Sequence, residues 1–444
     1  MTIDEFQKAV IAYAKEIGLE AYELYYAEQA SESVTAMAGR IEEFSGDVVM
    51  GATFRCVVNG KTGYCSTELF TDEEARRIVC KAAENAAVIE SEEEAILFGG
   101  SDSYAEVCNP EPESVDMRAL ALSLHEKAMQ YDPKVQKNSE AAVSVGKGSI
   151  RLVNSCGLDL SNTYSHQIVT QEVLVREGEE QYNSYSFSDK PFSELDPDAL
   201  TKEAADSALD MIRTGFVPSG KYKVVFSGRA FASILAAFSG LFSAKNAQQG
   251  MSLLAGKEGK VIASDNVTIL DDPFYADSPK TPFDGEGVAT FSKEVVDAGV
   301  FKTFLYNLAS AKKAGVESTG NGSRASYFSP VGISPYTFYL KPGEKTEEEI
   351  FEEVGDGIQV TQMAGMHAGL NPISGDFSLS SSGYRIENGK KAGYISQFTV
   401  SGNFFSMLKN VAEVGSDLKF GMPHGFTRIG SPSVYIKELS VAGK

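Results

Sequence analysis

The side chains of this chain that could do metal or acid–base chemistry are few, and they are scattered along the sequence. Its four histidines are His125, His166, His367 and His424. Neutral imidazole is a preferred ligand of Zn²⁺, so two histidines near a carboxylate could begin a metal site. His367 and His424 fall in the glycine-rich stretches GMHAGLNP and GMPHGF, the kind of loop that often carries ligand-binding residues. Together with Asp376 they are a weak candidate for a two-histidine metal site.

The other two histidines and the acidic pairs favour structural interpretations. His125 precedes Glu126, but no second histidine follows within a helical turn, which favours an ordinary surface or half-buried helix position. His166 falls in a predicted strand and is expected to be a satisfied sheet residue. Asp284 and Glu286 in FDGEG could form a carboxylate pair, yet a glycine-rich turn with solvated acids explains them as well and is favoured. The sequence has neither a G-x-S-x-G nucleophile elbow nor a G-x-x-x-x-G-K-[ST] phosphate loop.

The serine-rich stretch 371–389, NPISGDFSLSSSGYRIENG, is the strongest candidate for a binding surface. Its turn-forming pairs predict a strand that begins after Gly375, and Asn388-Gly389 predicts a hairpin turn into the next strand. A strand with so little side-chain bulk lets another backbone approach, which suits a peptide cleft that works by strand addition. A tightly packed sheet is the alternative. The candidate peptide-contact residues are Asn371, Ser374, Gly375, Asp376, Ser378 and Ser380.

Two small helix-plus-sheet units are predicted in the first half of the chain. Thr2 and Glu5 form a capping-box pattern for a first helix that ends near residue 18. Thr71 and Glu74 form a second capping box, for a helix that would cover one face of a sheet. Alternating apolar residues between these helices predict antiparallel strands. The expected strands are 21–28, 33–37, 40–44, 48–58 and 61–66.

The second unit follows a predicted boundary, formed by the acidic run 90–94 and the polar run 99–103. Ser114 is expected to cap a helix that ends near residue 131, and Asp196 with Pro197 begins another. The order of helix, sheet and helix resembles that of the first unit. The expected strands are 140–145, 149–154, 158–163, 166–176 and 179–187.

A large β-rich domain is predicted from residue 221 onward. It opens with a short buried strand at 222–226 and a helix at 229–243 with a continuous apolar face. Short strands and turns then alternate to the end of the sequence. We therefore predict an α+β protein with two small N-terminal helix-plus-antiparallel-sheet units and a large β-rich C-terminal domain. The expected domains are 1–98, 110–217 and 221–444.

Length and composition limit the classes of function. A chain of 444 residues is too long for one ordinary core. A formal net charge of −21 would repel phosphate backbones and anionic lipids, so no nucleic-acid or membrane partner is expected. Five cysteines without a C-x-x-C pair favour reduced thiols. With no basic-then-apolar N-terminus and no apolar run of about 18 residues, a cytoplasmic location is expected.

Separate segments of the chain resemble the TldD/PmbA family. The stretch 371–389 is similar to the family's C-terminal signature, an N-P-x-x-G-D-F-S run followed by E-N-G. RIEEFSGDVVMGATFRCVVNGKTGYCST, near the start, is similar to the family's N-terminal domain. TPFDGEGV with AGVFKTFLYNLASAKKAGVESTGNGSRA, and later VAEVGSDLKF, resemble its C-terminal domain in the same order.

The resemblance implies a protease fold without the family's metal ligands. TldD-type members are zinc metalloproteases with H-E-x-x-x-H on the helix that here corresponds to about 229–243, and with a cysteine ligand nearer the C-terminus. This chain has the run Leu235 to Gly240, LAAFSG, on that helix and no cysteine after Cys156. In this respect it resembles the PmbA branch, also called TldE. No catalytic residue is therefore expected in this chain.

The resemblance further implies a partner, a TldD-type catalytic subunit that holds the zinc while this chain binds none. The pair would form a cytosolic heterodimeric metalloprotease that acts on peptides and unfolded chains. Two alternatives stay open from the residues. One is a divergent stand-alone metallopeptidase with a relocated site at His367 and His424, and the other is a homodimeric protein that binds peptides without cleaving them.

Overall fold

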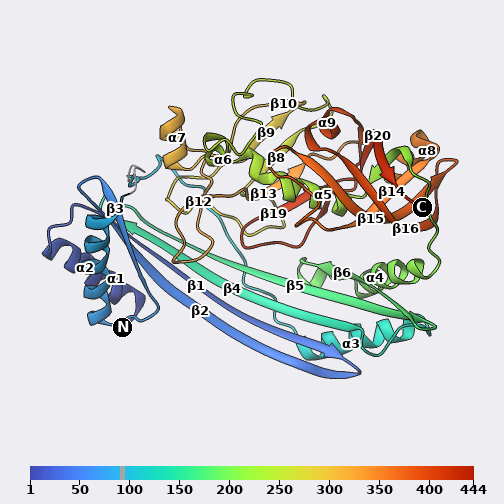
Figure 1. Cartoon of the computed structure of the whole chain (residues 1–444). Coiled ribbons are helices and arrows are strands. Elements are labelled where there is room, and N and C mark those ends of the chain that lie inside the picture. Colours follow the sequence, from blue (N-terminus) through green and yellow to red (C-terminus); the bar gives the residue numbers. More distant parts are fainter. Residues whose placement is uncertain (91–95) are drawn as a thin grey trace.

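The fold places a long curved sheet beneath a β-rich C-terminal domain (Figure 1). This description rests on a computed structural model that describes residues 1–90 and 96–444. Residues 91–94 of the expected acidic boundary therefore lie outside the described residues. Helices pack on the long sheet, and shorter strands dominate the C-terminal half, so the predicted α+β class is confirmed.

The N-terminal half is built on one six-stranded antiparallel sheet in the order β3-β2-β1-β4-β5-β6. Strands β1 and β4 pair from Glu23–Asn154 to Met37–Glu140, so the two predicted helix-plus-sheet units share a single sheet. Several expected strands join into longer ones. The strands are β1 (Ala21–Met37), β2 (Arg40–Val58), β3 (Lys61–Thr67), β4 (Glu140–Asn154), β5 (Asp159–Glu177) and β6 (Glu180–Ser188).

Helices cover the two ends of this sheet and leave its middle open. Helices α1 (Ile3–Glu16) and α2 (Asp72–Val88) pack against β1 and β2 at one end. Helices α3 (Met117–Tyr131) and α4 (Pro197–Ile212) pack at the other end. Both capping residues of the first unit are confirmed, since Thr2 and Thr71 accept backbone hydrogen bonds.

The cap of α3 differs from the expected one. Its N-cap is Asp116, whose carboxylate accepts hydrogen bonds from the backbone N–H groups of Arg118 and Ala119. The predicted cap, Ser114, lies two residues before it. A carboxylate at the N-cap interacts with the helix dipole more favourably than a hydroxyl does, which explains the choice.

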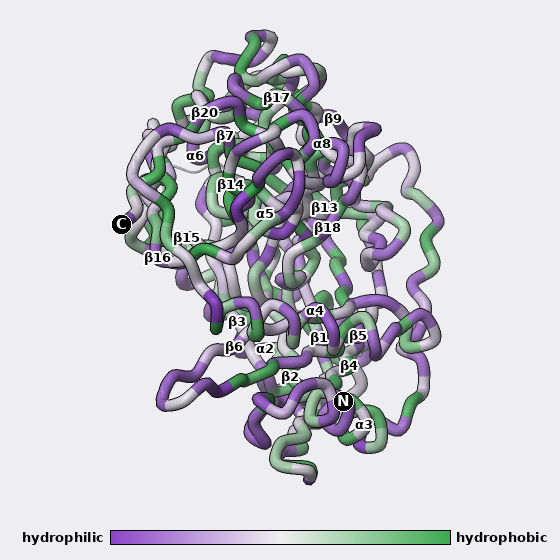
Figure 2. Tube along the Cα trace, turned by 90° about the vertical axis from the view of Figure 1, so that its right-hand side faces the viewer, coloured by the Kyte–Doolittle hydropathy of each residue, from purple (hydrophilic) through white to green (hydrophobic). Residues whose placement is uncertain are grey.

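The C-terminal domain contains two further six-stranded sheets around one apolar core. Hydrophobic segments run through its interior, where β14 and β15 lie (Figure 2). Strands of the first sheet are β16 (Lys390–Asn403), β15 (Asp376–Glu387), β14 (Gly357–Ala364), β7 (Gly220–Phe226), β20 (Val434–Ala442) and β17 (Val411–Val414). Strands of the second are β10 (Val300–Phe301), β9 (Lys293–Asp297), β8 (Ile269–Asp272), β13 (Thr337–Leu340), β19 (Arg428–Ser431) and β18 (Lys419–Phe420).

Short helices and one small hairpin complete the domain. Helix α5 (Gly228–Phe238) follows β7 directly and buries Phe231, Ile234 and Phe238 in the core, as its apolar face predicts. The ring of Phe238 stacks on Phe404 at a centroid distance of 4.7 Å. The remaining elements are α6 (Ala244–Gln248), α7 (Leu308–Ala314), α8 (Glu347–Val354), α9 (Phe404–Lys409), β11 (Gly322–Ser323) and β12 (Gly332–Ile333).

All five cysteines are free. In the described part of the chain, no helix is both long and apolar enough to span a bilayer.

Candidate functional site

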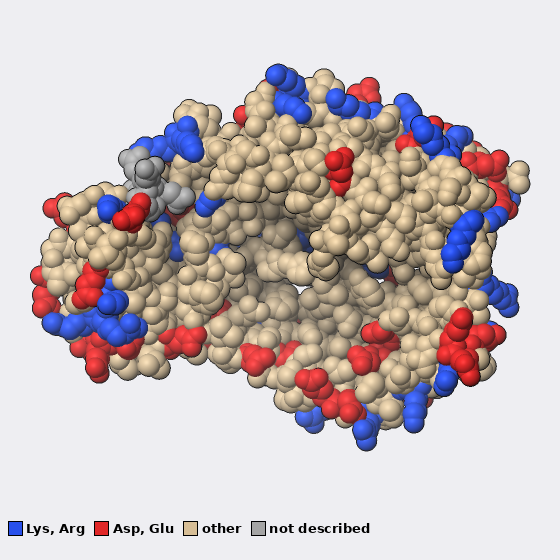
Figure 3. Space-filling view, in the orientation of Figure 1, with Lys and Arg blue, Asp and Glu red and all other residues tan. Residues whose placement is uncertain are grey.

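A cleft lies where the concave face of the long sheet meets the C-terminal domain. Figure 3 shows the molecule hollowed between these two parts. The cleft has a volume of about 430 Å³, which is enough for several side chains of a peptide. Its lining comes from β5, from the segment that leads into α3, and from loops of the C-terminal domain. The lining residues are Gln29, Asn109–Glu113, Tyr164–Ile168, Asp189, Pro191, Ala276–Pro279, Pro423, Gly425, Phe426 and Arg428.

Aromatic rings and a neutral histidine dominate the chemistry of this cleft. Tyr164 and Phe426 meet edge to face at 4.6 Å between ring centroids. The imidazole of His166 lies directly over Gly146 in the neighbouring strand, where any Cβ would overlap it. Burial lowers the pKa of His166 and raises the pKa of Tyr164, so both are neutral near pH 7. The lining thus combines these uncharged rings with the carboxylates of Glu111, Glu113 and Asp277.

Arg428 supplies the buried charge at this cleft, and it is already paired. Its guanidinium forms an ion pair with Asp189 at 2.6 Å and lies over the ring of Phe420. Asp189 follows β6, so this pair also ties the long sheet to the C-terminal domain. The cleft can hold a ligand, and Arg428 serves to join its two walls.

The acids of the FDGEG turn are buried, so the expectation that they are solvated is wrong. Asp284 is 1% exposed and Glu286 is 4% exposed. The turn is covered by Arg324 and the strand that begins at Gly322. The Asp284 carboxylate accepts hydrogen bonds from three backbone N–H groups, including that of Gly322 at 2.7 Å. Burial and the neighbouring Glu286 raise the pKa of Asp284 to about 7.

Beside this turn, a buried ion-pair cluster fastens the N-terminal sheet to the C-terminal domain. Glu23 of β1 pairs with Arg55 of β2 at 2.8 Å and with Arg324 at 2.5 Å. The Arg324 guanidinium also lies over the ring of Tyr25. All of these charged side chains are almost fully buried. Because the one Glu23 carboxylate holds a guanidinium from each part, the cluster positions the two parts relative to each other.

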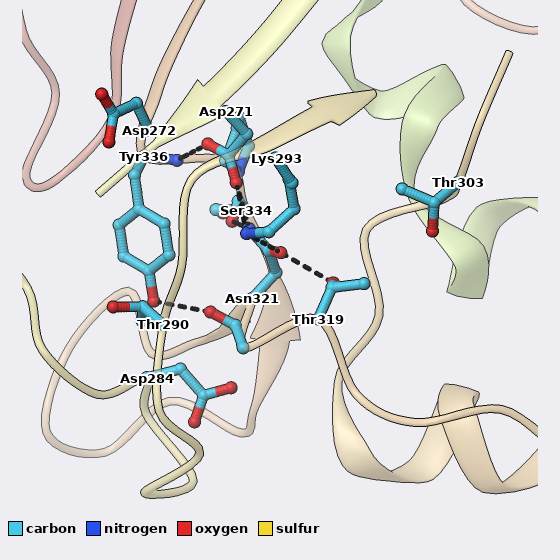
Figure 4. A network of polar contacts seen from close by, with 12 residues as sticks. Asp271, Asp272, Asp284, Thr290, Lys293, Thr303, Thr319, Asn321, Ser334 and Tyr336 are labelled. Atoms are coloured by element: carbon cyan, nitrogen blue, oxygen red, sulfur yellow. Dashed lines mark hydrogen bonds and ion pairs between the residues drawn. The ribbon is translucent and has the colours of Figure 1, made fainter. Parts of the chain in front are cut away.

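A second buried network supports the loops near the turn (Figure 4). Lys293 contacts Asp271 at 3.2 Å and Asn321 at 3.1 Å, and Asn321 donates to Asp271 at 2.7 Å. The backbone N–H of Tyr336 donates to the same aspartate. These polar groups satisfy one another inside the domain, so the network is structural.

The helix expected to hold the family's metal ligands does not fit a zinc ion. The side chains exposed on α5 are those of Ser233 and Ala236, with Arg229 and Ala237 half-buried. None of them supplies the imidazole, thiolate or carboxylate that zinc requires. Within residues 1–90 and 96–444, no group of three or more His, Cys, Asp and Glu side chains could hold a metal ion.

The histidines are separated in the structure. His367 and His424 are both exposed, on different loops, so they do not form the two-histidine site with Asp376. His125 is 3% exposed, more buried than expected, and its Nε2 accepts a hydrogen bond from the backbone N–H of Gly39. His166, placed correctly in a strand, lines the cleft. Sequence periodicity could not reveal that His166 lines a cleft, since the opposite wall of the cleft comes from residues more than 100 positions away.

The six candidate peptide-contact residues lie outside the lining of the cleft, and Gly375 among them is buried. Strand β15 pairs with β16 from Asp376 and with β14 from Ser380 onward, and the Ser378 N–H donates to the Gly369 carbonyl, so its backbone is not open to the strand addition expected from the sequence. The Asp376 carboxylate accepts from Ser374 and Asn403, and Asn371 caps the turn before the strand. Asp376, Ser378 and Ser380 nevertheless present exposed side chains on one face. The six residues are Asn371, Ser374, Gly375, Asp376, Ser378 and Ser380.

Three consecutive segments of the chain match models of a known metallopeptidase family. Family models described as PmbA/TldA metallopeptidase domain 1, central domain and C-terminal domain match residues 22–86, 109–212 and 219–443. The fold is therefore that of a PmbA/TldA-type metallopeptidase. The chain belongs to the PmbA/TldD family.

Relatives and solved structures agree with this assignment. The chain is 25% identical to the metalloprotease PmbA of Escherichia coli O157:H7, over 93% of this chain and 90% of that protein. It is 28% identical to an uncharacterized protein of Methanocaldococcus jannaschii, over 94% and 95% of the two chains. A crystal structure from Thermotoga maritima, described as a proposed modulator of a DNA gyrase, has a TM-score of 0.89 and 31% identity, covering 99% and 100%. TldE from Thermococcus kodakarensis has the same fold, with a TM-score of 0.89 at 22% identity and the same coverage.

Proposed function

We propose that this chain is the non-catalytic, PmbA/TldE-like subunit of a cytosolic two-subunit metalloprotease that acts on peptides and unfolded chains. In this account a TldD-type partner holds the zinc and performs the hydrolysis. The present chain contributes peptide-binding surface and no reacting group.

One observation carries the proposal. Helix α5 lies where the family's metal ligands are expected, and its exposed side chains are those of Ser233 and Ala236, with Arg229 and Ala237 half-buried. Hydrolysis by a zinc-bound water needs three protein ligands and a general base. Since α5 supplies neither, the chemistry belongs to another subunit.

The cleft supports a role in holding peptides. Its walls carry prolines and aromatic rings, of which Tyr164 and Phe426 touch each other. Apolar side chains of an unfolded segment gain free energy on entering such a site. The exposed polar face of β15, with Ser378 and Ser380, is proposed as a second contact surface, through side chains, because its backbone is already paired.

The test is reconstitution of the chain with a TldD-type subunit from the same source. We expect peptidase activity on unfolded substrates with both subunits and none with this chain and Zn²⁺ alone. Filling the cleft with Ala276→Arg should lower the activity of the pair by about tenfold without changing its zinc content. The matched control is Ala325→Arg, since Ala325 is also exposed and lies outside the cleft lining.

Two outcomes would overturn the proposal. Turnover by the chain alone with one bound zinc would mean a divergent metallopeptidase. Equal effects of the two arginine variants would mean that the peptide binds elsewhere.

A further inference from the structure

The charged side chains that line the cleft do not balance. The lining contains no lysine, and its single arginine, Arg428, is already paired with Asp189. Burial lowers the pKa of His166, so this imidazole adds no positive charge near pH 7. Three further carboxylates belong to the lining, those of Glu111, Glu113 and Asp277. The cleft therefore carries an excess of negative charge.

The three carboxylates are charged and open to a ligand. Glu113 accepts hydrogen bonds from the Oγ of Ser193 at 2.6 Å and from its backbone N–H at 2.7 Å. These bonds lower the pKa of Glu113, so it is ionised near pH 7. Glu111 lies 3.8 Å from Lys147, and because both side chains are more than half exposed, this pair is weak. Asp277 is exposed. All three can therefore interact with a cation that enters the cleft.

Aromatic rings line the same cleft as these carboxylates. Tyr164 and Phe426 meet there edge to face. The face of an aromatic ring attracts a cation, and a planar guanidinium can also stack on it, which an ammonium group cannot do. A guanidinium further matches a carboxylate through two parallel hydrogen bonds. Carboxylates together with aromatic rings thus suit the side chain of an arginine.

The chain uses this combination for arginines of its own. Arg428 is paired with Asp189, and its guanidinium lies 4.1 Å from the ring centroid of Phe420. The buried cluster at Glu23 repeats the arrangement, with a guanidinium 4.5 Å from the ring centroid of Tyr25. In both places a guanidinium contacts one carboxylate and one aromatic ring. The cleft offers the same two kinds of group, but there the guanidinium must come from a ligand.

We propose that the cleft selects peptide segments in which an arginine lies next to an apolar residue. In this arrangement the guanidinium lies among the three carboxylates, and the apolar side chain packs against Tyr164 and Phe426. A volume of about 430 Å³ is enough for two large side chains. This inference rests on the proposed function, because it names the class of peptide that the site prefers.

The charge of the whole chain favours the same ligand. A formal net charge of −21 attracts cationic segments, and salt screens this attraction beyond about 10 Å at roughly 0.1 M. A peptide held by its arginine should therefore bind more weakly as the salt concentration rises. A peptide held by apolar contacts alone should not.

The test is the binding of short peptides to the purified full chain. Because the chain contains no tryptophan, the fluorescence anisotropy of a tryptophan in the peptide reports binding without a signal from the protein. Three otherwise identical peptides carry arginine, lysine or citrulline beside a phenylalanine, and citrulline has nearly the shape of arginine without its charge. We expect the arginine peptide to bind about tenfold more tightly than the citrulline peptide at about 50 mM salt, and about threefold at about 500 mM. The lysine peptide should lie between them.

Neutral isosteres locate the charge recognition. Glu111→Gln combined with Asp277→Asn should reduce the preference for arginine over citrulline to about twofold. The Asp277 change leaves the contact with Arg428 intact, because Arg428 donates to the backbone carbonyl. The matched control combines Glu317→Gln with Glu344→Gln, which removes the same charge from exposed positions outside the lining and should keep the preference.

The outcomes separate this inference from the proposed function. Equal affinities for the arginine and citrulline peptides would overturn the inference and leave a peptide site without charge selection. Binding of none of the peptides would contradict both, since every lining residue belongs to this chain. Equal loss of preference in the two double variants would assign it to overall charge and overturn the inference.

A final comparison distinguishes a peptide from a small cation. Agmatine carries a guanidinium without a peptide backbone or an apolar neighbour, and it should bind at least about tenfold more weakly than the arginine peptide. Equal binding of agmatine would overturn the inference. If the cleft variant fails to fold by circular dichroism, the comparison of arginine with citrulline on the unchanged chain decides.

Discussion

Glu23→Ala tests whether the buried ion-pair cluster holds the N-terminal sheet to the C-terminal domain. The change removes the partner of Arg55 and Arg324, each nearly fully buried. Removing one member of a buried pair costs roughly 3–5 kcal/mol, because the remaining charge stays desolvated. The lower figure applies here, since Arg55 keeps the Ile96 carbonyl and Arg324 keeps the Gly285 carbonyl as acceptors.

The assay is thermal unfolding followed by circular dichroism. At roughly 2.1 cal/mol/K per residue, a loss of about 3 kcal/mol lowers Tm by about 3 °C in a chain of 444 residues. Glu16→Ala is the matched control, because the Arg76–Glu16 pair is more than half exposed and should give no resolvable shift. The Tm of Glu23→Gln should lie between those of Glu23→Ala and Glu16→Ala. Equal Tm values for Glu23→Ala and Glu16→Ala would refute the role given to the cluster.

Two further predictions concern the C-terminal turn and the packing of α2. The pKa of Asp284 is raised to about 7, so between about pH 4 and 7 the folded state keeps a proton that the unfolded state has lost. Stability from this group therefore falls as pH rises, by roughly 1 kcal/mol per pH unit, and Asp284→Asn should flatten that slope in urea unfolding; an unchanged slope contradicts this. Gly63→Ala should destabilise by about 1–3 kcal/mol, because its Cβ would overlap the backbone of α2, whereas Gly393→Ala, with open space around it, should be nearly neutral.

The sequence predicts correctly those helices and strands in which apolar residues recur at a regular spacing without interruption. The capping residue Thr2 and the apolar face of α5 are examples, because both depend on neighbours within a few residues. The prediction that each long strand of the N-terminal sheet is two shorter strands is wrong, since β1, β2, β4 and β5 are continuous. Their middle lies between the two helical covers, where side chains such as Gln29 and Glu32 are exposed and apolar alternation lapses while backbone pairing continues.

Burial set by distant segments could not be predicted. Asp284 lies in a glycine-rich turn typical of the surface, but Arg324 and the Gly322 strand cover it. Likewise, β15 has the small side chains of an accessible strand, yet neighbours on both sides occupy its backbone. Each outcome depends on contacts between residues far apart in sequence, which hydrophobic periodicity does not encode.

Zinc content and peptidase activity of the purified chain alone show whether this chain is the non-catalytic subunit. The protein would be prepared without chelator, dialysed against Zn²⁺ and analysed by metal emission spectrometry, with hydrolysis of an unfolded substrate measured on the same sample. We expect far less than one zinc per chain and no turnover, with both appearing when a TldD-type subunit is added. One zinc per chain with turnover in the absence of a partner would contradict it.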